Sequence, residues 1–177
     1  MKKLRFILIS IVVLLTSGRA AAYDFESGGL FYNIIDGNAK TVELTCSNYT
    51  DWSTVSDYTG DIVVPATVTS GGVTYTVKRI GQLAFKNSSI TSLTLSEGIE
   101  SIEQDICENC NQLASLSFPS SLRSIKYAAF WSCDALTSIS LPEGLTTLGN
   151  DVFRYCGGIK NYSGHQVNRS CWYRQEG

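Results

Sequence analysis

The chain has 177 residues, of which 44% are hydrophobic and 17% are charged, and its formal net charge is −2 at pH 7. This composition is ordinary for one globular unit and excludes a disordered or fibrous chain. Its lysines and arginines are mostly scattered singly, without the basic patch that is typical of nucleic-acid or anionic-membrane binders.

Residues 1–22 have the organisation of a secretory signal peptide. Three basic residues near the N-terminus precede an apolar run from Phe6 to Leu15, which is far shorter than the roughly 20 residues that span a bilayer. Small alanine side chains follow and predict cleavage before Tyr23, and the alternative is an uncleaved membrane anchor. Cleavage would leave 10 basic and 16 acidic residues, a formal charge of −6, and no membrane span.

Residues 23–76 predict an N-terminal β-hairpin cap. Two β-prone runs, 30–35 and 40–45, flank an Asp-Gly-Asn turn, and two more, 62–69 and 73–77, flank a Ser-Gly-Gly turn. Such hairpins are suited to covering the apolar end of a repeat array.

A repeat of 23 residues follows, with full copies at 90–112, 113–135 and 136–158. Apolar residues recur at the first, fourth and sixth positions, which is the spacing of a short strand whose inward side chains stack on the next coil. A partial copy at 77–89 precedes these, and 159–177 is either a degenerate repeat or a tail. The pattern predicts a β-rich solenoid with a parallel sheet on one face and an irregular or short helical outer side.

The copies, such as LASLSFPSSLRSIKYAAFWSC from Leu113, resemble the BspA-type (Treponema-type) leucine-rich repeats. The family pattern runs L-x-x-I-x-I-P-x-x-V-x-x-I-G-x-x-A-F-x-x-C, and residues 77–158 follow it. The resemblance implies a leucine-rich-repeat solenoid that is secreted or displayed on a bacterial cell surface. It also implies an adhesin-like function, with extracellular or cell-surface proteins, including host matrix proteins, as partners. The alternative is a carbohydrate-contacting or structural accessory module of that surface.

Cys110, Cys133 and Cys156 share one repeat position, which predicts a structural ladder with Cα atoms about 5 Å apart. Ladder side chains point in parallel, whereas a disulfide needs converging Cβ atoms, so we expect buried free thiols, with a disulfide as the alternative. Zinc needs four ligands, and the single histidine, His165, lies in the tail, so no metal or other cofactor is expected. The state of three further cysteines stays open: Cys46, Cys107 and Cys171.

Tyr127, Trp131, Arg154 and Tyr155 are the predicted binding residues, because they occupy repeat positions where no aromatic or cationic side chain is required. Interface energy concentrates in Trp, Tyr and Arg. The alternative is that these side chains only shield neighbouring coils. The outward strand positions hold serine and threonine, a hydroxyl ladder that hydration alone would also explain.

No catalytic residues are predicted. Nucleophilic catalysis needs a base and an orienting acid beside the nucleophile, and one histidine in a repeat-breaking tail does not supply them. The Glu-Gly pairs at 97–98 and 143–144 share one repeat position and indicate turns rather than a pair of catalytic acids. The sequence therefore favours a protein that is not an enzyme.

Overall fold

The structure, a computed structural model, describes residues 23–48 and 53–164. The predicted signal peptide at 1–22 and the tail from 165 onward, with His165 and Cys171, lie outside these residues. The described part contains strands and turns and no helix, so it has no helical segment that could cross a membrane. The strands are β1 (Phe25–Ser27), β2 (Leu30–Asp36), β3 (Thr41–Thr45), β4 (Thr59–Val64), β5 (Thr67–Ser70), β6 (Val73–Ile80), β7 (Ser89–Leu95), β8 (Ser101–Ile102), β9 (Ser115–Ser117), β10 (Ser124–Ile125), β11 (Ser138–Leu141), β12 (Thr147–Leu148) and β13 (Asn161–Gly164).

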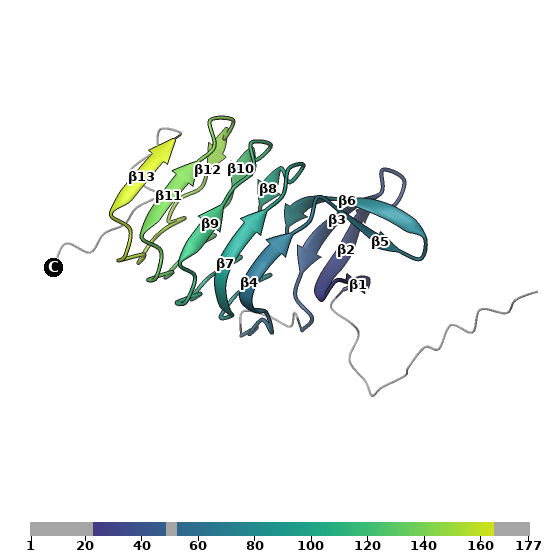
Figure 1. The fold of residues 1–177 in the computed structure, drawn as a ribbon, viewed down its shortest axis with the longest axis horizontal. Helices are drawn as coiled ribbons and strands as arrows, with labels where there is room; N and C mark the ends of the chain where they lie inside the picture. Colours follow the sequence, from purple (N-terminus) through teal and green to yellow (C-terminus); the bar gives the residue numbers. More distant parts are fainter. Residues whose placement is uncertain (1–22, 49–52, 165–177) are drawn as a thin grey trace, which may run out of the picture.

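The coils stack along the long axis of the molecule, with the N-terminal strands at one end and β13 at the other (Figure 1). The repeat strands lie side by side along one face and pair in parallel in two groups. In the first, β4 pairs with β7 and β7 with β9, and in the second, β11 pairs with β13. Leu93 lies opposite Leu116, so residues of the fourth repeat position meet across adjacent coils. This confirms the β-rich leucine-rich-repeat solenoid with a parallel sheet on one face.

A second parallel ladder, which the sequence analysis did not predict, forms the opposite side of the coils. It joins β6, β8, β10 and β12, and its strands are mostly two residues long. Ile102, Ile125 and Leu148 are in register in this ladder and occupy the thirteenth repeat position. Each full repeat therefore contributes one strand to each of the two opposite sides of the solenoid.

The N-terminal segment is continuous with the solenoid. The hairpins β2–β3 and β5–β6 are antiparallel, as the two turn motifs predict. The β-prone run 62–69 is divided, however, because Val64 ends β4 and Pro65 separates it from β5. Since β4 pairs in parallel with β7 from Thr59 onward, the stack of parallel strands begins within the segment 23–76.

One hydrophobic core runs from Leu30 in the first hairpin to Phe153 in the last full repeat. The ring of Phe130 stacks on that of Phe153 with centroids 5.5 Å apart, and Phe118 meets Phe130 edge-on at 5.8 Å. Because each coil buries its apolar edge only against a neighbour, the stability of the array comes from contacts between coils.

The irregular outer turn of each coil contains two residues with left-handed backbone conformation. These are the sixteenth and twentieth repeat positions, where φ lies between 51° and 61° in every coil. None of these residues is a glycine. Such residues interrupt right-handed helix geometry, which explains why the outer side is irregular rather than helical. The residues concerned are Leu83, Asp105, Ala128 and Asp151 at the sixteenth position and Asn87, Asn109, Ser132 and Tyr155 at the twentieth.

Candidate binding site

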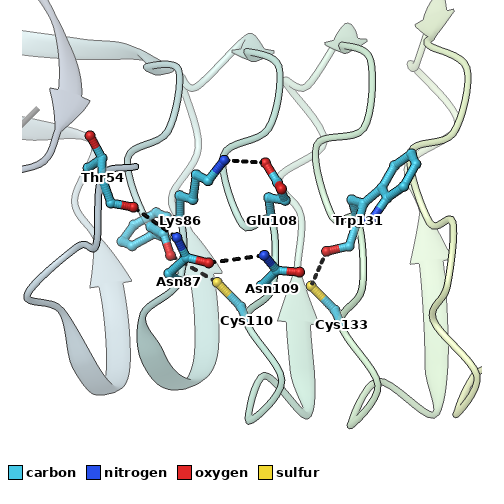
Figure 2. Close-up of polar contacts among 9 residues, drawn as sticks. Thr54, Lys86, Asn87, Glu108, Asn109, Cys110, Trp131 and Cys133 are labelled. Carbon is cyan, nitrogen blue, oxygen red and sulfur yellow. Dashed lines mark hydrogen bonds and ion pairs between the residues drawn. The ribbon is translucent and has the colours of Figure 1, made fainter. Parts of the chain in front are cut away.

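The nineteenth repeat position places unlike side chains next to one another along the outer turns. Its occupants are Lys86, Glu108, Trp131 and Arg154. Lys86 Nζ lies 2.6 Å from Glu108 Oε2 (Figure 2), and the guanidinium carbon of Arg154 lies 4.7 Å from the centroid of the Trp131 ring. An ion pair is thus followed along the same column by a cation–π pair.

Trp131, Arg154 and Tyr155 form one packed cluster. The guanidinium carbon of Arg154 also lies 4.9 Å from the Tyr155 ring centroid, and its Nη2 donates to the Tyr155 hydroxyl at 3.2 Å. The two aromatic rings meet edge-on, with centroids 5.1 Å apart. Asp151 Oδ2 lies 3.6 Å from Arg154 Nη1 and balances its charge. The cluster therefore holds the arginine head between two rings.

Tyr155 adopts a backbone conformation that its repeat position reserves for smaller polar residues. Its φ is 59°, and 38% of the residue is exposed. Asn87 and Asn109 occupy the same position, and Asn109 Nδ2 donates to Asn87 Oδ1 at 3.0 Å (Figure 2). Asparagine tolerates left-handed geometry, whereas a bulky residue there costs about 1–3 kcal/mol. The cluster is thus built at a strained position.

Replacing Tyr155 by asparagine or by alanine should separate this strain from the ring contacts. Both changes remove the contacts with Trp131 and Arg154, but only asparagine is favoured at positive φ. We expect Tyr155→Asn to be more stable than Tyr155→Ala by about 1 kcal/mol in urea unfolding. Equal unfolding midpoints for the two variants would contradict backbone strain at this position.

Of the four predicted binding residues, the structure brings three together. Tyr127 is 48% exposed and lies at the fifteenth repeat position, but the ring contacts that join Trp131 and Tyr155 do not include it. The sequence placed all four in the variable outer segment. It gave no signal of the arginine between the rings, because Trp131 and Arg154 are a full coil apart in the chain.

The cysteine ladder consists of buried free thiols. Each thiol donates to a carbonyl one coil earlier: Cys110 to Phe85 at 2.9 Å, Cys133 to Cys107 at 3.1 Å, and Cys156 to Phe130 at 3.0 Å. Figure 2 shows two of these cysteines, Cys110 and Cys133, side by side in the ladder. Thiols are small and weak donors, so they suit a position that is apolar but faces a backbone carbonyl.

Cys46 and Cys107 are also buried and free. Burial raises the pKa of the Cys107 thiol well above its ordinary value. A buried thiol with a raised pKa is a poor nucleophile, because the thiolate is the reactive form. These cysteines therefore contribute to packing rather than to chemistry.

A second charged group lies beside the ion pair of the outer turns. Lys86 is 5% exposed and Asp105 is 6% exposed. Burial, followed by the negative charge of Glu108, raises the pKa of Asp105 to about 6, against the opposing effect of Lys86. The arrangement places two carboxylates near one buried ammonium group.

The raised pKa of Asp105 gives a stability that depends on pH with a definite sign. The folded state binds the proton more tightly than the unfolded chain, so stability falls as pH rises from about 4 to about 6 and stays low above that. We expect Asp105→Asn, which also suits the left-handed backbone, to be more stable than the parent by about 1–2 kcal/mol above pH 6.

Urea unfolding at about pH 4 and pH 7.5 checks this expectation. The difference in free energy of unfolding between variant and parent should be largest at pH 7.5 and shrink to a small part of that at pH 4. At pH 4 the Asp105 carboxyl is protonated in the folded state and about half protonated in the unfolded chain. If the difference in free energy of unfolding between the two proteins does not change with pH, the Asp105 carboxylate does not titrate in the predicted range.

Among the described residues, no group of three or more His, Cys, Asp and Glu side chains could hold a metal ion. The outer turns carry packed aromatic and charged side chains. Such a set is suited to contact with another macromolecule.

The stacked coils, the two parallel ladders and the inward apolar columns define a leucine-rich-repeat solenoid. A family model described as "BspA type Leucine rich repeat region" matches six copies over residues 67–171, so the chain belongs to this family. The match covers more than half of the chain and begins before the predicted boundary at 77. No curated protein matches.

Solved structures of bacterial leucine-rich-repeat proteins have the same fold. A protein from Bacteroides capillosus is 26% identical with a TM-score of 0.66, over 80% of this chain and 98% of that one. A protein from Bacteroides ovatus is 23% identical with a TM-score of 0.60, over 80% of this chain and 41% of the other. A "leucine rich cell surface protein" from Faecalibacterium prausnitzii is 20% identical with a TM-score of 0.56, over 84% and 44%.

Proteins with BspA-type repeats are typically secreted or displayed on the cell surface, and leucine-rich-repeat proteins are generally not enzymes. The likenesses below 25% identity establish the fold alone. The family thus supplies a class of protein, and the binding partner has to be argued from this chain's own residues.

Proposed function

We propose that the chain is a non-catalytic, exported module that binds extracellular or cell-surface proteins, including host matrix proteins, in the manner of an adhesin. The observation that carries the proposal is the cluster of Trp131, Arg154 and Tyr155 on the outer turns. These three residue types dominate the energy of protein interfaces. The family supports a location at the cell surface.

The strain at Tyr155 supports a role beyond packing. Asn87, Asn109 and Ser132 occupy the same position in the other coils without a ring, so the fold itself does not need tyrosine there. Strained backbone that persists is characteristic of functional sites. The rings also hold Arg154 in place, which reduces the side-chain entropy that a partner would have to offset on binding.

The same geometry favours a protein partner over a sugar at this cluster. A sugar ring stacks on an open aromatic face, but Arg154 lies over the Trp131 ring and over the Tyr155 ring. The edge of one aromatic ring meets the other as well. The cluster is thus arranged to present a cationic group between aromatic rings rather than a stacking platform.

The proposal is tested with residues 23–177 and immobilised extracellular-matrix proteins, beside immobilised glycans. We expect saturable binding to a matrix protein, weakened about tenfold or more by the Trp131→Ala and Arg154→Ala double variant. The matched control is Arg123→Ala with Lys126→Ala, which removes the two exposed cations that flank β10 in the second ladder.

Each outcome decides between the readings. Loss of binding in the cluster variant alone supports the protein-binding module. Binding to glycans only would replace it with the carbohydrate-contacting accessory module. A folded sample that binds no matrix protein, or a cluster variant that binds as well as the parent, would contradict the proposal.

A further inference from the structure

The C-terminal end of the solenoid leaves an inward repeat position exposed. At this end (Figure 1), β13 is the last described strand of its face and pairs with β11. Tyr162 on β13 occupies the fourth repeat position and lies opposite Ile139. Ile139 is 4% exposed, whereas Tyr162 is 66% exposed. The same inward position is thus buried within the array and exposed at its end.

The second ladder ends in the same way at β12, its last described strand. Ile102, Ile125 and Leu148 occupy its thirteenth repeat position. Ile102 and Ile125 are fully buried, but Leu148, in the last full repeat, is only partly buried. Ile159, the first residue of the next copy, is partly buried as well. Because each coil of such an array buries its apolar edge against a neighbour, the last coil calls for a further element to cover it.

Residues 165–177 follow β13 directly and continue the repeat in register. Since β13 is offset from β11 by 23 residues, they correspond to positions seven to nineteen of a further coil. In every full repeat, position twelve holds a hydroxyl residue and position thirteen an apolar one, and these two positions form β8, β10 and β12. Ser170 and Cys171 have the same two places in the next copy, and the family match extends to residue 171. The sequence of this segment therefore suits one more strand of the second ladder.

We propose that residues 165–177 cover the open end of the solenoid, with Ser170 and Cys171 lying beside Thr147 and Leu148 as a further strand of the second ladder. The register is the one in which β12 pairs with β10, one coil earlier. Cys171 then takes the inward position, where a thiol serves as a small apolar side chain. The segment occupies the end at which a second copy would otherwise dock, and this prevents the head-to-tail contacts that generate filaments.

Alkylation of the reduced, folded protein, residues 23–177, with iodoacetamide tests the proposal, with each cysteine followed by peptide mass spectrometry. Cys46 and Cys107 serve as internal controls, because both are fully buried. We expect Cys171 to react at least about tenfold more slowly than in the urea-unfolded protein, because it becomes accessible only through local opening. The protection should not change over about a hundredfold range of protein concentration, since the covering segment belongs to the same chain.

Two aspartate variants test whether Cys171 packs inward. Cys171→Asp puts a carboxylate at the proposed inward position. The matched control, Ser170→Asp, puts one at the adjacent outward position, where Thr147 of the previous coil is exposed. We expect Cys171→Asp to lower the urea concentration at the midpoint of unfolding, because a buried carboxylate without a partner is unfavourable. Ser170→Asp should leave that midpoint unchanged.

The proposal is overturned if Cys171 of the folded protein reacts as fast as in urea while Cys46 and Cys107 stay protected. It is also overturned if Cys171→Asp unfolds at the same urea concentration as the parent. Protection of Cys171 that appears only at high protein concentration, together with a dimer in analytical ultracentrifugation, would overturn it as well and place a second copy of the chain at this end.

Discussion

Replacing Lys86 by methionine is expected to lower the free energy of unfolding by about 3 kcal/mol at pH 7.5, as measured by urea unfolding. Lys86 is buried and lies 2.6 Å from Glu108, beside the buried carboxyl of Asp105. Removing the ammonium group leaves two carboxylates near one another without their cation. Breaking a buried ion pair from one side is costly because the remaining charge stays desolvated.

Two further variants show whether the loss comes from the uncompensated charge. Adding Glu108→Gln to Lys86→Met should recover part of the stability, because it removes one of the two carboxylates. The matched control is Lys78→Met, which breaks an ion pair of the same 2.6 Å length between side chains that are 36% and 54% exposed. We expect a change of less than about 1 kcal/mol there. Equal losses for Lys86→Met and Lys78→Met would contradict the argument from burial.

Phe130→Ala is expected to destabilise the protein by about 3–5 kcal/mol. The ring of Phe130 is fully buried, stacks on Phe153 in the next coil and meets Phe118 in its own coil. Truncation removes both ring contacts and leaves a cavity. The neighbouring side chains cannot move in to fill it, because the coils on both sides hold them in place. Because the contacts join coils, the cooperativity of unfolding should fall as well.

Urea unfolding followed by circular dichroism measures this loss, with Tyr127→Ala as the control. Tyr127 is an aromatic residue of the same coil that is 48% exposed, so its truncation should change stability by about 0.5 kcal/mol or less. A Phe130→Ala variant that is as stable as the control would show that the phenylalanine column does not hold the coils together.

Much of the candidate site could be predicted from the sequence because the repeat separates required from free positions. Trp131, Arg154 and Tyr155 stood out at positions where the pattern asks for no aromatic or cationic group. Their arrangement could not be predicted. The cation–π geometry depends on which side chains of adjacent coils meet, and the positive φ of Tyr155 is a property of the turn.

The second ladder could not be predicted from the sequence either, because it also depends on contacts between adjacent coils. Strands as short as Ser124–Ile125 have no room for the alternation of apolar and polar residues that identifies a strand. The pairing of β4 with β7 was hidden as well, because a run of β-prone residues before a turn also predicts a hairpin. Both features depend on contacts between coils, which a local pattern does not record.

The sequence by itself determined the 23-residue period, the inward apolar columns and the cysteine ladder, since each follows from residues that recur at one position. The tertiary structure decided which unlike residues become partners. Lys86 meets Glu108, and Arg154 meets Trp131, only after the chain has closed one coil and stacked it on the one before. The physical reason is that stacking turns a separation of about 23 residues along the chain into a distance of about 5 Å between neighbouring strands.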